Sequence, residues 1–221
     1  MEYRYIATSV TGFVQQVATG YLQHGYWFYV TGTIPEHKDP TKTDAKLLAK
    51  YGIDVSRNTR ARRKQAGRAN VQYLRLGRFF VLLATHGEHL FFDEEAGRVR
   101  DIRKSPLIVG GYSITYKRGN YKRKQPGHAK AEPDTKWHAR VQIARETFRD
   151  LKAHFVDVST RWSAERLARD IYHLPYEPYA PVRQQLHALL LTINRNRAVA
   201  GLPIVSPNIL RWRRAIVRPF D

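Results

Sequence analysis

The sequence predicts an α+β fold, in which a mixed or antiparallel sheet with packed helices is followed by a small C-terminal helical subdomain. Short runs of aromatic and β-branched residues, bounded by glycine and proline, recur up to about residue 156 and are typical of strands. Beyond that point the apolar residues recur at helical spacing. We therefore expect an α+β domain over residues 1–160 and a helical subdomain over 161–221.

The first quarter of the chain predicts a helix, a strand and a second helix. Apolar residues over 10–21 share one helical stripe, and Ser9 or Thr8 is the candidate N-cap before them. The aromatic and β-branched segment 26–34 is typical of a buried strand. Asp39 stands directly before a proline, which is a preferred first helical residue, so a helix is expected over 40–51.

The middle of the chain predicts a hairpin. Two strand-like runs, 71–76 and 78–85, lie on either side of Gly77, and residues 90–92 are expected to continue the sheet as a further strand. This part of the chain therefore supplies most of the predicted sheet.

A longer strand is expected over 107–116, with the Gly110-Gly111 pair forming a bulge within it. The segment 117–135 is rich in Lys, Arg, Gly and Pro and is predicted to be a loop. Alternating apolar residues over 137–143 then predict another strand.

Four helices are predicted after this strand. Helical spacing of apolar residues marks segments 148–155, 163–174 and 181–201, and Ser163 is the candidate N-cap of the second. A serine and a proline at 206–207 predict a short terminal helix over 207–217. The last three of these helices form the predicted C-terminal subdomain over 161–221.

Basic residues greatly outnumber acidic ones. The chain has 38 Lys and Arg against 19 Asp and Glu, a formal net charge of +19, and more arginine than lysine. Such an excess destabilises a compact state through self-repulsion, and a polyanionic partner relieves it. A GC-rich genome would explain the preference for arginine but not the shortage of acids. Because the composition is 43% hydrophobic and 12% aromatic, the chain can bury a core, so we expect a folded protein that binds RNA or DNA.

Several classes of protein are excluded or disfavoured. The absence of cysteine excludes disulfides, thiolate zinc sites and a cysteine nucleophile. No apolar run is long enough to span a bilayer, and the N-terminal residues lack the pattern of a signal peptide. These features predict a cytoplasmic protein without a membrane partner, associated with the nucleoid or with a ribonucleoprotein. The sequence leaves the oligomeric state open.

Three clusters of basic residues are candidate phosphate-binding surfaces. We name them by their residues: the 57–68 cluster, the 116–124 cluster and the 211–214 cluster. Their members are Arg57, Arg60, Arg62, Arg63, Lys64 and Arg68 in the first, Tyr116, Lys117, Arg118, Tyr121, Lys122, Arg123 and Lys124 in the second, and Arg211, Arg213 and Arg214 in the third. Any one cluster is also compatible with a merely solvated surface, whereas three without neighbouring acids favour a polyanionic partner.

The composition of two clusters bears on the kind of nucleic acid. Tyrosines among the basic residues of the 116–124 cluster offer flat faces for unpaired bases, although Tyr116 is equally compatible with a core position. This favours structured RNA or single-stranded nucleic acid over duplex DNA. The predicted helix 207–217 would alternatively place the 211–214 cluster in a major groove, but the connection over 201–206 is longer than a helix-turn-helix normally uses.

A possible metal site follows the predicted strand 78–85. Here His86, Glu88 and His89 come together within four residues. Two histidines and a carboxylate at a strand end are a suitable ligand set for a divalent metal ion near a phosphate. The simpler interpretation is an ordinary turn at the tip of a hairpin.

Together with the strand over 26–34, this motif resembles the rolling-circle initiators and related HUH nucleases. Those families place two metal-binding histidines on a strand and a nucleophilic tyrosine on a helix. The resemblance implies a metal-dependent endonuclease or nickase, with Tyr172 as a candidate nucleophile and Tyr176 or Tyr121 as alternatives. Two residues separate the histidines here where the family has one, and the intervening residues are not hydrophobic.

The sequence therefore predicts a nucleic-acid-binding protein that acts as an accessory of a ribonucleoprotein or mobile-element system. The HUH-like nuclease is the alternative, and only that alternative requires a cofactor, a divalent metal ion. A ribosome-associated structural protein is a third possibility, which the substantial aromatic content disfavours. Whether the protein is an enzyme stays open at this point.

Overall fold

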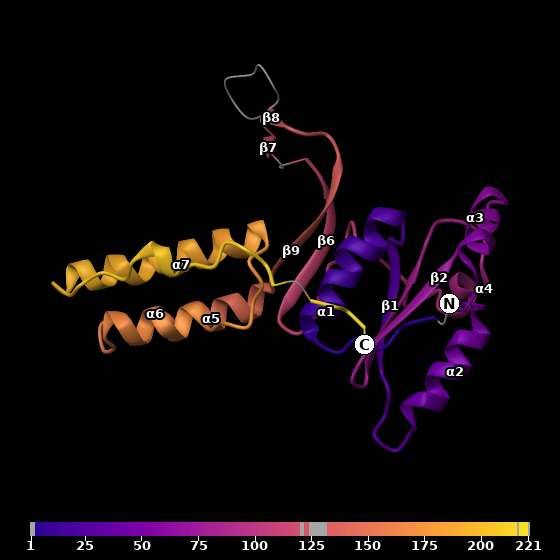
Figure 1. Cartoon of the computed structure of the whole chain (residues 1–221), viewed down its shortest axis with the longest axis horizontal. Coiled ribbons are helices and arrows are strands. Elements are labelled where there is room, and N and C mark those ends of the chain that lie inside the picture. The colour runs from indigo at the N-terminus through magenta and orange to yellow at the C-terminus, as the bar shows by residue number, and fades with distance from the viewer. Residues whose placement is uncertain (1–2, 120–121, 124–131, 216, 221) are drawn as a thin grey trace. The chain divides into compact units, whose positions relative to one another are not determined.

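The structure is a computed structural model that describes residues 3–119, 122–123, 132–215 and 217–220. Within these residues it has an α+β fold with a C-terminal helical part, which confirms the predicted fold class (Figure 1). The helices are α1 (Val10–Gln15), the π-helical turn η1 (Gln16–Tyr21), the 3-10 turn η2 (Leu22–His24), α2 (Pro40–Lys50), α3 (Arg57–Gln65), α4 (Leu90–Glu94), α5 (Arg145–Val158), α6 (Ala164–Tyr172), α7 (Ala180–Val199) and the 3-10 turn η3 (Pro207–Ile209). The strands are β1 (Phe28–Thr33), β2 (Val71–Leu76), β3 (Phe79–Ala84), β4 (Arg100–Asp101), β5 (Leu107–Val109), β6 (Tyr112–Arg118), β7 (Lys122–Arg123), β8 (Glu132–Pro133) and β9 (Trp137–Ile143).

The chain forms two compact units. The sheet unit comprises Met1–Leu107, Ile114–Arg140 and Arg218–Asp221, and the helical unit comprises Ile108–Ser113 and Val141–Val217. The division passes through β6 and β9, and it groups α5 with the C-terminal helices. The predicted domains 1–160 and 161–221 are not tested by this grouping and stay a prediction.

The sheet unit is built on an antiparallel sheet with the strand order β2-β3-β1-β4. Leu82 of β3 lies opposite Val30 of β1, and Val81 lies opposite Leu74 of β2. Two helices, α2 and α3, connect β1 to β2, and α4 connects β3 to β4. From β1 to β4 the element order is therefore that of the split β-α-β folds, with one helix more between β1 and β2. The turn between β2 and β3 contains Gly77, whose φ of 57° lies in the left-handed region that hairpin turns require.

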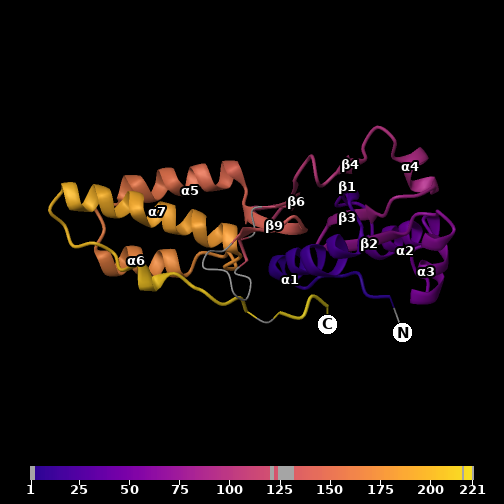
Figure 2. The ribbon, with the colours of Figure 1, turned by 90° about the horizontal axis from the view of Figure 1, so that it is seen from above.

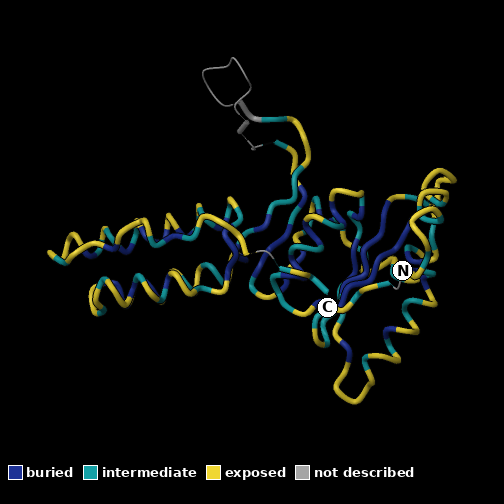
Figure 3. The backbone as a smooth tube through the Cα atoms, viewed as in Figure 1, coloured by how far each residue is buried: buried dark blue, intermediate teal, exposed yellow. Residues whose placement is uncertain are grey.

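Both faces of this sheet are covered, with α1 on one side of the strands and α2 on the other (Figure 1). On one face, Tyr51 after α2 and Phe91 of α4 pack together and join a cluster of buried side chains from β1, β2 and β3. On the other face, Phe13 of α1 packs against Phe79 of β3. The strands are accordingly dark blue in Figure 3, which marks them as the buried part of this unit.

A buried ion pair joins α2 to the sheet. Asp44 is fully buried on α2, and its carboxylate receives hydrogen bonds of 2.9–3.0 Å from Nε of Arg75 and one of 2.6 Å from the hydroxyl of Tyr73. The second guanidinium nitrogen of Arg75 lies 2.9 Å from the same carboxylate, and a third donates to the carbonyl of Gly77. Burying this carboxylate is tolerated because both of its oxygens are paired.

Most of the predicted caps are present. The side chain of Ser9 accepts a hydrogen bond from the amide of Gly12 at the start of α1. Asp39 does the same for the amide of Thr41 at the start of α2, and Ser163 caps α6. These contacts confirm the predicted positions at which those three helices begin.

The predicted strand over 90–92 is wrong, because this segment is the helix α4. The side chain of His89 accepts the amide N–H of Phe91, which provides an N-cap. Phe91 is fully buried against Tyr51, whereas Leu90 is half-exposed. Tertiary packing of the phenylalanine and the histidine cap therefore outweigh the strand propensity of a short apolar run.

The predicted bulge at Gly110-Gly111 is also wrong. The two glycines form the turn between β5 and β6, with φ angles of 53° and 77°. A two-residue hairpin turn of this kind needs φ above zero at both positions, which glycine adopts without strain. A Cβ on Gly111 would also lie 2.7 Å from the hydroxyl of Tyr176, so the position is closely packed.

The helical unit contains α5, α6 and α7, which run alongside one another in both views (Figure 2). These helices confirm the three helical segments predicted for 148–155, 163–174 and 181–201. Arg197 of α7 is buried and donates hydrogen bonds of 2.5–2.7 Å to the carbonyls of Ser159, Trp162 and Pro203. Its guanidinium thus joins the C-terminal end of α5 to α7. Among the described residues, none of the helices has the length and hydropathy needed to cross a membrane.

We expect the substitution Asp44→Ala to lower the free energy of unfolding by about 3–5 kcal/mol, because it leaves the guanidinium of Arg75 buried without its carboxylate. Urea denaturation followed by circular dichroism measures this loss. Asp54→Ala removes an exposed carboxylate and is the matched control, with an expected change within about 0.5 kcal/mol. Equal effects of the two substitutions would contradict a structural role for the buried ion pair.

Candidate nucleic-acid interface

The 57–68 cluster forms the helix α3 and the turn that follows it. Ser56 caps the helix by accepting the amide N–H of Thr59. The helix contains no acidic residue, and its backbone is mostly yellow, meaning exposed, in Figure 3. Four members of the cluster are exposed to solvent: Arg57, Arg62, Lys64 and Arg68. Within the described part of the chain, none of these four forms an ion pair with an acidic side chain.

The other two arginines of this cluster hold α3 in place. Arg63 donates a hydrogen bond of 2.9 Å to the carbonyl of Gly52, at the end of α2. The guanidinium of Arg60 lies 5.7 Å from the ring centre of Tyr3, and its backbone carbonyl accepts a hydrogen bond from the side-chain amide of Asn70. These half-buried arginines thus anchor the helix, while the four exposed cations face solvent.

The 116–124 cluster lies only partly within the described residues. Lys117 and Arg118 are exposed on β6, where Lys117 donates to the carbonyl of Arg103 and Arg118 donates to that of Thr135. Lys122 and Arg123 form the strand β7, which pairs with β8. The two remaining members, Tyr121 and Lys124, lie outside the described residues.

Tyr116 is part of a stack of aromatic rings. Its ring stacks on that of Trp27, with ring centres 5.9 Å apart, and on that of Trp137 at 5.7 Å with an interplanar angle of 17°. Tyr116 is therefore only 8% exposed, and burial raises its pKa. Because Tyr116 is buried, the most exposed ring of this stack is that of Trp137, which is 43% exposed.

Sequence reasoning treated Trp137 only as a strand residue and gave no role to Trp27 or Arg103. The guanidinium of Arg103 lies 4.5 Å from the ring centre of Trp27 and extends the stack. The available sequence signal was a tryptophan next to Lys136 at the start of a predicted strand. That signal was insufficient because the pairing of β6 with β9 brings Tyr116 and Trp137, twenty-one positions apart in the chain, into contact.

The 211–214 cluster is not helical, so the predicted helix over 207–217 is wrong. After the single turn η3, Leu210 has the extended angles φ −73° and ψ 126°. Arg211 donates hydrogen bonds to the carbonyls of Leu174 and Tyr176, and Glu177 accepts the amide N–H of Ala215. These tertiary hydrogen bonds replace the intrahelical ones, and the segment offers no recognition helix for a major groove.

The exposed members of this cluster surround a tryptophan. Trp212 is 67% exposed, and the guanidinium of Arg183 lies 5.6 Å from its ring centre. Arg213 and Arg214 are exposed, and Arg214 lies 4.8 Å from the ring centre of Tyr179. The helical unit therefore also carries exposed cations next to aromatic rings.

The candidate metal ligands lie in a tight turn. His89 is half-buried near the ring of Tyr51, and its Nδ1 atom is engaged as the N-cap of α4. His86 and Glu88 are exposed. Gly87 between them has a φ of 132°, and a Cβ there would lie 2.5 Å from the carbonyl of Gly67.

The described residues contain no group of three His, Asp or Glu side chains placed to hold a metal ion together. The candidate nucleophile Tyr172 is half-exposed on α6 in the helical unit. Tyr176 is buried, and its ring packs edge-on against that of Tyr112. Tyr121 lies outside the described residues.

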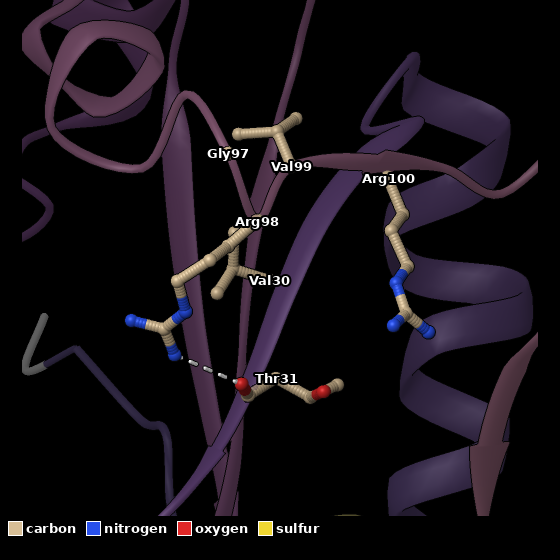
Figure 4. A pocket seen from close by; sticks show the side chains of 6 residues that line it. All are labelled: Val30, Thr31, Gly97, Arg98, Val99 and Arg100. Atoms are coloured by element: carbon tan, nitrogen blue, oxygen red, sulfur yellow. Dashed lines mark hydrogen bonds between the residues drawn. The ribbon is translucent and has the colours of Figure 1, made fainter.

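One pocket of about 210 Å³ lies beside β1 and β4 (Figure 4). It is lined by Val30, Thr31, Gly97, Arg98, Val99 and Arg100. Arg98 donates a hydrogen bond of 3.4 Å to the carbonyl of Thr31 and forms an ion pair with Glu95. Figure 4 shows the side chains of Arg98 and Arg100 extending in different directions from this edge of the sheet. The pocket is small and strongly basic, and no sequence pattern predicted it.

The pKa of His89 predicts a pH dependence of stability. Burial lowers this pKa, and the nearby charge of Arg63 lowers it further. The unfolded chain therefore binds more protons than the folded one, and the free energy of unfolding falls as the pH drops below about 6.5. His89→Asn keeps an N-cap acceptor but does not titrate, so its unfolding free energy should fall less between about pH 7.5 and 5.

Urea denaturation across this pH range measures the difference between His89→Asn and the wild type. The matched control is His86→Asn, an exposed residue at the other end of the same turn, which should follow the wild type. An identical pH dependence in all three proteins would show that folding does not lower the pKa of His89.

A comparison of the chain with protein-family models, curated proteins and solved structures finds no match.

Proposed function

We propose that this protein binds nucleic acid, and that the exposed face of α3 contacts the phosphate backbone. The observation that carries the proposal is the acid-free helix α3, which presents exposed cations without ion-pair partners among the described residues. Cations that contact phosphates release condensed counterions, which favours binding at low salt. Since Arg60 and Arg63 anchor the helix, little backbone order has to be gained on binding.

The preferred ligand is single-stranded nucleic acid or the unpaired part of a structured RNA. Each unit has an exposed tryptophan in a basic segment: Arg118 bonds to the carbonyl of Thr135, two residues before Trp137, and Arg183 lies over the ring of Trp212. Such pairs bind bases that are free to stack and phosphates at the same time. Residues 211–214 are not helical, so this cluster provides no recognition helix for the major groove of a duplex.

The biological setting of this binding, a ribonucleoprotein or a mobile-element system, stays a prediction. The HUH-like nuclease also stays a prediction, since no observation among the described residues favours it over binding without cleavage. Incubation of the His86→Ala/His89→Ala variant with a labelled single strand and a divalent metal ion tests that alternative directly. Cleavage by the wild type that is lost in this variant would establish it.

The experiment that tests the proposed function is a binding titration monitored by fluorescence anisotropy. Single-stranded DNA, single-stranded RNA and duplex DNA of equal length are compared between roughly 50 and 200 mM salt. We expect binding to the single strands to be tighter than to the duplex and to weaken steeply with salt. A protein that binds none of the three at the lowest salt concentration would refute the proposal.

We expect the double substitution Arg62→Gln/Lys64→Gln to weaken the binding of every nucleic acid tested and to reduce the salt dependence. The slope of log Kobs against log salt should decrease in magnitude by about 1.4–1.8, from two contacts at about 0.7–0.9 each.

The matched control for this pair is Lys42→Gln/Lys46→Gln, which removes the same charge from the exposed side of α2. The control should retain the wild-type slope. A slope that is unchanged in the α3 variant, or reduced equally in both, would exclude α3 as the phosphate-binding surface.

A further inference from the structure

Trp137 is the exposed end of a stack of four planar groups in the sheet unit. The order is Arg103, Trp27, Tyr116 and Trp137. The guanidinium lies 4.5 Å from the first ring centre, and successive ring centres are 5.9 and 5.7 Å apart, with interplanar angles of 26° and 17°. Trp137, which is 43% exposed, is thus the exposed end of a row of stacked planar groups.

The far end of the stack is held rigidly. The guanidinium of Arg103 forms hydrogen bonds of 2.7–3.1 Å with both carboxylate oxygens of Asp101, and this contact lowers the pKa of Asp101. The indole N–H of Trp27 donates to the carbonyl of Leu22. Because each ring is fixed by its neighbour, a ligand that stacks on Trp137 immobilises little additional side-chain freedom.

Exposed cations lie on β6 and next to the start of β9. Lys136 precedes Trp137 in the chain and is exposed, and Lys117 and Arg118 are exposed on the neighbouring strand β6. Arg118 is held close to this segment by its hydrogen bond to the carbonyl of Thr135. The site therefore combines one flat apolar face with positive charge on two adjacent strands.

We propose that Trp137 binds one unpaired nucleobase by stacking, while Arg118, on the neighbouring strand, contacts an adjacent phosphate. This inference rests on the proposed function and assigns a base-binding site to it. A nucleotide fits because it joins a planar π system to an anionic phosphate. A methylated ammonium ligand would be repelled by the surrounding cations, and a neutral sugar would leave them without a partner.

The test compares two ligands that differ only in their bases. A single strand of thymidines and an abasic strand of the same length carry the same phosphates. We expect the wild type to bind the thymidine strand more tightly, by about five-fold or more, since base stacking on an aromatic ring contributes about 1–3 kcal/mol. In a Trp212→Leu background, which leaves Trp137 as the exposed tryptophan, Trp137→Leu should largely abolish this preference, whereas affinity for the abasic strand and the salt slope should stay at the values of the background protein.

The matched control is Trp162→Leu, which removes a half-buried tryptophan of the helical unit and should keep the preference for bases. A preference that persists in Trp137→Leu, or disappears equally in the control, would overturn the inference while leaving phosphate binding intact. If the wild type binds both strands equally, the inference fails alone. If it binds neither strand, the proposed function fails with it.

A second measurement avoids any change in the stack. In Trp162→Phe/Trp212→Phe, the two remaining tryptophans, Trp27 and Trp137, both belong to the stack. Their fluorescence should be quenched by the thymidine strand and not by the abasic strand at equal saturation. Equal emission with the two strands would contradict base stacking on Trp137.

Discussion

The buried carboxylate of Asp44 is the contact on which the position of the proposed binding surface depends. It joins α2 to the sheet through Arg75 and Tyr73. The end of α2 then places Tyr51 in the core and presents the carbonyl of Gly52, which receives the guanidinium of Arg63 from α3. The orientation of the exposed cations on α3 is thus set by a chain of contacts that begins at one buried acid.

Arginine has a structural role in this protein besides supplying the excess positive charge. Buried and half-buried arginines such as Arg197, Arg78 and Arg211 donate mainly to backbone carbonyls. A guanidinium has five donors in a planar fork, so several carbonyls at loop and helix ends can satisfy it without a full counter-charge. The chain can therefore bury arginines with few acids, and its positive charge is not neutralised internally. This leaves the excess charge available to a polyanion.

The aromatic stack adds a different kind of recognition to this charge. Cations on α3 and β6 can attract any phosphate backbone, and their effect is screened by salt. A flat ring such as that of Trp137 discriminates between stacked and unpaired bases, and this contact is largely independent of salt. The two features lie in the same unit, so one bound strand could use both.

The sequence by itself determined the fold class and most of the helices and strands, because caps, turns and apolar periodicity are local signals. Ser9, Asp39 and Ser163 begin their helices where the pattern predicted. Only the tertiary structure decided that residues 90–94 form a helix and that Arg211 lies in an extended segment, since the burial of Phe91 and the carbonyl partners of Arg211 come from distant parts of the chain. For the same reason, sequence reasoning identified the basic clusters but not which arginines face inward, nor that Trp137 rather than Tyr116 is the exposed ring.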